Sequence, residues 1–364
     1  MKIRIAVFIA LSSIATIALA ASNRISNGLI IHSSGEVAIE RQNGLIVSPT
    51  GGTPIYPGDK LRTAQNAQLT IQCADLEIKS IAPGENQLNS CLLAKSDCSD
   101  DFVKCPNRGP KKLTWNSAPI PYIISPRRTK LLEGKPILRW NPVAGATSYK
   151  LSLRENGAKL NWEMTVSGTE AVYPGEPALK PGVKYRLIVE ANTGASSESP
   201  LVEEDTEFGL LEPKQVEGVK DAVGAIDKQV PNENAKKLAI STIYFNTNLI
   251  AEAIEILENI QKTGGETPPI NRALGDMYLE KLELVPQAEV YYSKAINTAK
   301  PDDIEELTAA RYGLGQVHSS MRNNLEAMRY LKLAKDGYQS LGDLPMVEKI
   351  GKQLRDLQRR EERK

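Results

Sequence analysis

The sequence is poor in the residues that most often carry catalysis or nucleic-acid binding. Its 364 residues include only 2 histidines, His32 and His318, which lie far apart in the chain. No serine-hydrolase elbow, H-E-x-x-H metal motif or Walker phosphate loop occurs. Aromatic residues make up only 5% and the formal net charge is +1, so neither base stacking nor phosphate attraction is indicated. We therefore expect a protein without catalytic activity, cofactor, metal or nucleic-acid partner.

Long apolar runs are also scarce, and the clearest one is at the N-terminus. The chain opens with MKIRIAVFIALSSIATIALAASN, in which Lys2 and Arg4 precede an apolar run from Ile5 to Leu19. Small residues at 18–20 then provide a cleavage site. We expect residues 1–21 to be a secretory signal peptide, and the mature chain to be periplasmic or secreted with no stable membrane span. The alternative, an uncleaved anchor, needs about 20 apolar residues.

The few cysteines are clustered in one part of the chain. An even, clustered set in an exported protein predicts two disulfides, and three pairings are open. A zinc site is the alternative, but the cluster contains no C-x2-C pair and no nearby histidine. The residues concerned are Cys73, Cys91, Cys98 and Cys105.

Within the predicted domain 22–115, apolar and polar residues alternate with period two over residues 22–110, as half-buried strands require. Turn signals such as PTGGTP, YPGD and APGE separate the alternating segments. The segments are EVAIE (36–40), KLRTA (60–64), AQLTIQC (67–73) and LEIKSI (76–81). This region is predicted to be a small all-β domain, followed by a cysteine-rich flap.

The same region resembles a FecR-like domain, the periplasmic β module of iron-dicitrate sensor systems. The resemblance covers about 50 residues, and it lies in SGEVAIER and in PIYPGDKLRTAQNAQLTIQCADLEIKSIAPGE. The positions that match the family pattern are Gly58, Asp59, Leu61, Thr63, Ala67 and Leu69. The family implies an envelope module, for which an envelope glycan is one candidate ligand.

A second β segment occupies residues 116–208. Trp140 ends the run PILRW, Tyr149 begins the next alternating run, and Tyr185 follows an L-x-P-G turn in PALKPGVKY. A buried tryptophan facing alternate tyrosines and leucines is typical of a two-sheet core. The segment resembles a fibronectin type III domain, which implies a spacer or recognition module. Residues 209–233 are expected to be a linker or a short helix.

From residue 234 to residue 364 the apolar period becomes helical. The tetratricopeptide pattern W-x2-L-G-x2-Y, then A-x3-F, then P, recurs about every 34 residues. Three copies resemble it, at 237–260, 271–301 and 311–334, and the second needs one extra residue between its helices, at ELVPQ. The last segment predicts a charged capping helix. The predicted fold class is therefore multidomain: a FecR-like β domain, a fibronectin III-like sandwich and a tetratricopeptide solenoid.

The stretch RYGLGQVH at 311–318 could be mistaken for a phosphate loop because it contains Gly313 and Gly315. A phosphate loop needs a strand before it and a helix that opens at the glycines, whereas helical spacing continues through this stretch. We expect small residues here to let two helices approach each other. The packing positions of this kind are Ala253, Gly275, Ala288, Gly315 and Ala327.

The tetratricopeptide resemblance implies a concave face, lined by the first helix of each repeat, that binds an extended peptide. The mixed charge of this face favours a protein or peptide partner. Its members are Phe245, Asn246, Arg272, Asp276, Glu280, Tyr312, Gln316 and Ser319.

The expected function is a periplasmic adaptor whose helices bind a protein partner while its β modules dock on envelope components. The alternative is a signal-relay regulator of the FecR type, held at the membrane by an uncleaved N-terminal segment. Loss of the N-terminal residues on export would exclude this alternative.

Overall fold

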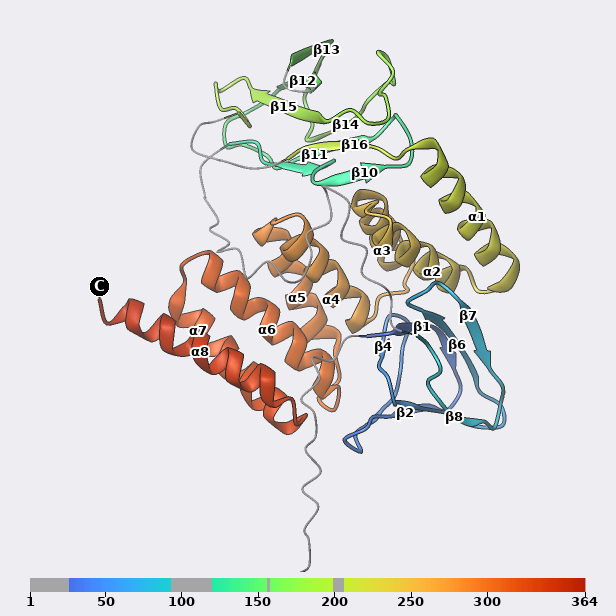
Figure 1. Ribbon diagram of the computed structural model, residues 1–364. Helices are drawn as coiled ribbons and strands as arrows, with labels where there is room; N and C mark the ends of the chain where they lie inside the picture. The colour runs from blue at the N-terminus through green and yellow to red at the C-terminus, as the bar shows by residue number, and fades with distance from the viewer. Residues whose placement is uncertain (1–25, 93–119, 156–157, 199–205, 364) are drawn as a thin grey trace, which may run out of the picture.

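The computed structural model describes residues 26–92, 120–155, 158–198 and 206–363. Two β modules and a stack of helices make up this part of the chain, with β-sheets in the N-terminal half and eight α-helices in the C-terminal half (Figure 1). The expected signal peptide, Cys98 and Cys105 lie outside the described residues. Within them, no helix has both the length and the apolarity that crossing a membrane requires.

The first β module (described residues 26–92) consists of two four-stranded sheets with the orders β4-β1-β6-β7 and β3-β2-β5-β8. The alternating residues of both sheets point inward to one core, which contains Ile30, Ile39, Leu61 and Leu69. The predicted alternating segments coincide with β2, β5, β6 and β7. The strands are β1 Gly28–Ser34, β2 Val37–Glu40, β3 Ile46–Val47, β4 Pro54–Ile55, β5 Lys60–Thr63, β6 Gln68–Cys73, β7 Ile78–Ile81 and β8 Asn86–Leu88.

One disulfide lies within this module. It joins Cys73, at the end of β6, to Cys91, and both cysteines belong to the module core. Cys73 also lies near Asp75 and Glu77, in an arrangement that could hold a metal ion. Because the Cys73 sulfur is bonded to Cys91, it cannot act as a thiolate ligand there.

The second β module (described residues 120–155, 158–198 and 206–210) has a five-stranded sheet, β10-β16-β15-β12-β13, and a three-stranded sheet, β14-β11-β9. Trp140 of β11 packs edge-on against Tyr149 of β12, with 5.5 Å between ring centroids, and both rings are buried. The strands are β9 Ile123–Ser125, β10 Thr129–Leu131, β11 Ile137–Trp140, β12 Tyr149–Glu155, β13 Ala158–Val166, β14 Glu170–Val172, β15 Tyr185–Ala191 and β16 Phe208–Leu210.

The segment expected to be a linker or a short helix is largely the 17-residue helix α1, Pro213–Gln229. Its apolar side buries Val219 and Ile226 in the same core as the helices that follow. In Figure 1, α1 runs from the second β module toward the helical stack. The two parts are therefore joined by a packed helix.

The remaining helices form three antiparallel hairpins and a closing helix. Each hairpin consists of a first helix and a second helix that packs against it. In the N-terminal part of the stack, the first helices face the first β module (Figure 1). The elements are α2 Glu233–Asn246, α3 Ile250–Lys262, α4 Pro268–Asp276, the π-helical turn η1 Met277–Lys281, α5 Val285–Thr298, α6 Ile304–Ser320, α7 Asn324–Ser340 and α8 Leu344–Glu361.

The three hairpins share one turn geometry. The turn residues Asn248, Glu283 and Arg322 all have left-handed backbones, with φ of 60°, 56° and 60°. Five positions after each of them, a fully buried alanine begins the contact between the two helices of the hairpin. A left-handed residue ends the first helix sharply, which lets the second helix fold back against it. The alanines are Ala253, Ala288 and Ala327.

The second hairpin contains one residue more than the others, and the π-helical turn η1 accommodates it. The turn amides of Leu249 and Asn323 bond to carbonyls five positions earlier, at 2.8 and 2.9 Å. The equivalent amide of Leu284 bonds to Tyr278, six positions earlier, at 2.7 Å. The prediction that the extra residue lies between the helices, at 283–287, was therefore wrong. A π turn absorbs a single inserted residue inside a helix.

The glycines of RYGLGQVH lie inside α6, where they meet side chains of the neighbouring helices. A Cβ atom on Gly313 would overlap the ring of Tyr292, and one on Gly275 would lie 2.7 Å from the same ring. A Cβ atom on Gly315 would lie 2.7 Å from Leu331. Only a residue without a side chain fits at these distances, so the glycines allow α4, α5, α6 and α7 to pack closely.

Candidate functional site

The first β module packs against the first helices of the hairpins, which is the face that the sequence predicted to be open for a partner. Thr267, at the start of α4, donates a hydrogen bond to the carbonyl of Gly51 at 2.8 Å. Gln72 of β6 donates to the carbonyl of Ala239 in α2 at 3.3 Å. Part of the predicted concave face is therefore covered by the chain itself.

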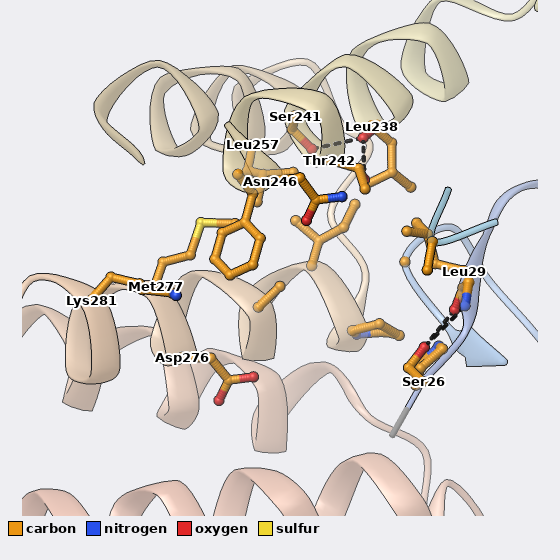
Figure 2. Close-up of a pocket in the computed structure, with 18 of the residues that line it drawn as sticks. Ser26, Leu29, Leu238, Ser241, Thr242, Asn246, Leu257, Asp276, Met277 and Lys281 are labelled. Atoms are coloured by element: carbon orange, nitrogen blue, oxygen red, sulfur yellow. Dashed lines mark hydrogen bonds between the residues drawn. The ribbon is translucent and has the colours of Figure 1, made fainter. Parts of the chain in front are cut away.

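A cavity of about 340 Å³ remains between this module and the helices, and we call it the groove cavity. Its walls are β1 and the end of β6 on one side, and α2, α4 and η1 on the other (Figure 2). This volume is within the range of ligand sites in proteins. Apolar side chains form most of its lining, namely Leu29, Leu238, Phe245, Leu257, Ile270 and Met277.

Polar groups make up a smaller part of the lining of the groove cavity, and one of them, Ser241, is buried. Asn246 and Glu280 are exposed at the mouth of the cavity, and the Lys281 ammonium lies 4.9 Å from the centre of the Phe245 ring. Partial burial lowers the pKa of Lys281, against the opposing effect of Glu280. Asp276 also lines the cavity and accepts a hydrogen bond from Tyr292 at 2.8 Å. A mostly apolar lining with a few polar groups suits an apolar side chain carried on a peptide backbone.

The eight residues predicted for the concave face are divided by the structure. Phe245, Asn246, Asp276 and Glu280 come together in the groove cavity. The other four lie elsewhere: Arg272 is paired with Asp276 and Glu306, Tyr312 packs on Tyr338 and Lys349, Gln316 bonds to Gln353 of α8, and Ser319 is half-buried on α6. Because α8 packs over part of α6, the open groove is shorter than the resemblance implies.

The module side of the groove cavity was not predicted from the sequence. Ser26, Leu29, Pro54 and Ala74 line it, and they belong to strands and turns that are remote from the helices along the chain. The alternating pattern identifies the strands on which or beside which they lie, but no local signal shows which other part of the chain covers them.

A network of buried and partly buried charges, which we call the Arg41 network, joins the module to the helices. The Arg41 side chain has no exposed surface; it contacts Asp59, and its Nη2 lies 2.6 Å from Glu305 Oε2 at the start of α6. Arg272 continues the network, with its Nε 2.8 Å from Glu306 and its Nη1 2.6 Å from Asp276. Four carboxylates thus share two guanidinium groups.

The excess of carboxylates over guanidinium groups accompanies shifts in the pKa of several members of the network. Burial raises the pKa of Asp59, Asp276 and Glu306, although Arg41 or Arg272 opposes the rise in each case. Burial alone would lower the pKa of Arg41, but the charges of Glu305 and Asp59 outweigh it and raise this pKa. The network therefore fixes the position of the module but binds protons more readily than isolated carboxylates do.

The second β module is attached to the turns of the first two hairpins through residues 127–129. Arg127 donates to the carbonyl of Leu282 at 2.6 Å, and Arg128 pairs with Glu283 at 2.5 Å. The Thr129 hydroxyl donates a hydrogen bond to the backbone carbonyl of Asn248 and accepts one from the amide of Ile250. Both left-handed turns are thus held by one tripeptide.

Glu252, in the first turn of α3, is also at this junction. Its Oε1 accepts a hydrogen bond from the amide of Leu132 at 2.8 Å, whereas its Oε2 is buried without a partner. Burial, followed by the charges of Glu255 and Glu133, raises the pKa of Glu252 to about 7, against the effect of the Leu132 amide. The group is therefore close to half-protonated at neutral pH.

We expect Glu252 to make the protein more stable at pH 5 than at pH 8. A carboxyl whose pKa is raised on folding binds its proton more tightly in the folded state, so stability is lost as pH rises through about 7. From the shift, the contribution of this group is about 2 kcal/mol between these two pH values. Urea unfolding of the wild type and of Glu252→Gln at both pH values measures it. If the free energy of unfolding depended on pH equally in the two proteins, the raised pKa of Glu252 would be contradicted.

Comparison with known proteins does not assign the chain to a family. No protein-family model matches it, and no curated protein matches it. Among solved structures, it is similar to the fibronectin(III)-like modules of Clostridium thermocellum CbhA, with a TM-score of 0.19 and 8% sequence identity, over 52% of this chain and 80% of that chain. At this TM-score the likeness supports no conclusion about function.

Proposed function

We propose that this chain is a non-catalytic adaptor of the bacterial envelope, which binds a protein partner through the groove cavity. The single observation that supports this proposal most is that four of the residues expected to contact a partner line an apolar cavity of about 340 Å³. The N-terminal signal pattern supports export to the periplasm.

The same proposal assigns a type of module to each of the three parts of the chain. The first β module is FecR-like, on the matching positions around Gly58 and Asp59, and the second is a fibronectin III-like spacer around Trp140. The hairpins are tetratricopeptide repeats, which is supported by their common turn geometry and by the small residues at Gly275 and Gly315. In such repeats the face formed by the first helices binds peptides.

The partner is expected to insert a bulky apolar side chain into the groove cavity. Leu29, Phe245 and Met277 provide apolar contact, and Asn246 can bond to a peptide backbone at the mouth. The complete mature chain is the appropriate material for a test, because residues 234–364 alone would uncover the surface on which the first β module packs.

Filling the cavity is expected to abolish partner binding. Ala273 lines the cavity, so Ala273→Phe should occupy the space that the partner needs. A photo-reactive phenylalanine analogue at position 245 would mark the partner in living cells. We expect one major cross-linked protein, reduced at least tenfold by Ala273→Phe.

The matched control is Ala225→Phe, which adds the same ring at an exposed position of α1. It should leave the cross-link unchanged, and melting curves should show that both variants are folded. Absence of a cross-linked protein, or an equal yield with Ala273→Phe, would contradict the proposal.

A further inference from the structure

A second cavity, which we call the junction cleft, lies between the second β module and the first helical hairpin. Its volume is about 320 Å³, and it is separate from the groove cavity. Leu132, Glu133 and Lys135 from the segment after β10 face Tyr244 of α2 and Glu252 and Glu255 of α3 across it. The contacts of residues 127–129 with the hairpin turns fix the two sides relative to each other.

Three carboxylates converge on the junction cleft at different depths. Glu252 is the deepest: its Oε2 is buried and has no hydrogen-bond partner among the described residues. Glu133 and Glu255 are exposed at the mouth. Their charges act on Glu252 strongly enough to contribute to its raised pKa. An unpaired buried carboxylate oxygen is costly unless it meets a donor or a cation.

The positive groups near the cleft in the described part of the chain are mainly engaged elsewhere, although the charge of Glu255 contributes to raising the pKa of Arg139. Within the described ranges, no lysine or arginine forms an ion pair with Glu133, Glu252 or Glu255. Arg139 lines the cleft, but its guanidinium is held by Glu170 at 2.6 Å and by Glu258 at 3.8 Å. Lys135 is exposed at the mouth, and its alkyl chain lies against Gly175.

We propose that the junction cleft binds a small aliphatic ammonium ion, with Glu252 Oε2 as the buried acceptor and Glu133 and Glu255 as the carboxylates at the entrance. The ring of Tyr244 and the side chain of Leu132 supply the apolar wall that an alkyl chain needs. An ammonium group brings three donors and one positive charge, which the unpaired oxygen of Glu252 can accept. The ligand is either a free amine or a lysine side chain of a peptide.

An organic cation suits the cleft better than a metal ion does. In the part of the chain that the structure describes, the carboxylates of the cleft do not gather within the 4.8 Å that a shared metal ion would require. A hard cation such as Ca²⁺ takes six to eight oxygen ligands at about 2.4 Å. Separated carboxylates around an open volume match a longer ligand that bears its charge at one end.

Calorimetric titration of the mature chain with n-butylammonium chloride at pH 8 tests the proposal. We expect saturable binding, at least tenfold weaker in Glu252→Gln and unchanged in Glu217→Gln, an exposed position of α1. At pH 7, binding should release about half a proton, because a bound cation favours the ionised carboxylate. Titration in buffers of different ionisation heat measures this release.

Three controls make the result decisive. 1-Butanol has the same chain without the charge and should not bind, and MgCl₂ should not compete at equal ionic strength. Nα-acetyl-lysine methylamide, titrated in parallel, shows whether a lysine side chain also enters.

Glu255→Gln provides a second variant, expected to weaken binding about threefold, in case Glu252→Gln fails to fold. No saturable heat, binding of 1-butanol equal to that of the amine, or unchanged affinity in both variants would overturn the proposal.

Discussion

Arg41→Met is expected to lower the free energy of unfolding by about 3–5 kcal/mol, because it removes the guanidinium whose charge compensates the buried Asp59 and the partly buried Glu305. Methionine keeps most of the buried volume, so the loss reports charge compensation more than packing. Urea unfolding followed by circular dichroism measures the change. Hydrogen exchange should also rise at the start of α6, where Glu305 is located.

The control for this prediction is Arg62→Met on the neighbouring strand β5. Arg62 pairs with Glu40, but its side chain is 44% exposed, so the loss should be below about 1 kcal/mol. Equal effects of the two substitutions would mean that the Arg41 network does not hold the first β module on the helices.

Tyr292→Ala is expected to cost about 3–5 kcal/mol, which is the usual range for removing a large buried ring. The ring is 1% exposed and fills the space that Gly275 and Gly313 leave between α4, α5 and α6. Its hydroxyl also donates to Asp276 at 2.8 Å. Tyr292→Phe, which removes only this bond to a charged group, should cost about 1.5–3 kcal/mol.

Leu325→Ala is the matched control for the ring, since Leu325 lies on α7 with 70% of its surface exposed. We expect a change within about 0.5 kcal/mol, measured by the same unfolding experiment. If Tyr292→Ala were no more costly than this control, the close approach of the helices would not depend on the ring.

The order of strands and helices was predictable because apolar residues recur with a different period in the β part and in the helical part of the chain. Alternating residues such as Val37 and Ile39 mark a strand, and buried alanines such as Ala253 and Ala288 mark a helical hairpin. The glycines of α6 were identified as helix contacts because helical spacing continues on both sides of them. These signals are local, and one sequence is enough to show them.

The contacts between the parts were not predictable in this way. Arg41 follows the strand residues AIE and looks like an exposed charge at a strand end, yet it has no exposed surface. Its partner Glu305 belongs to a charged helix start that also looks solvated. Likewise, the extra residue of the second hairpin was detectable from the number of residues between its two helix patterns. Its position in the π turn, however, depends on packing around Tyr278.

The separation between Arg41 and its partner has a consequence for biosynthesis. The two residues are 264 positions apart, so at about 5–20 residues per second the ribosome needs roughly 13–50 s to add the second after the first. If the chain crosses the membrane as it is made, the N-terminal module folds first, with Arg41 paired to Asp59 of the same module but not yet to Glu305. Holdase chaperones would have their main opportunity to bind during that interval. A chain that terminates before α6 would leave part of the docking surface of the first β module uncovered.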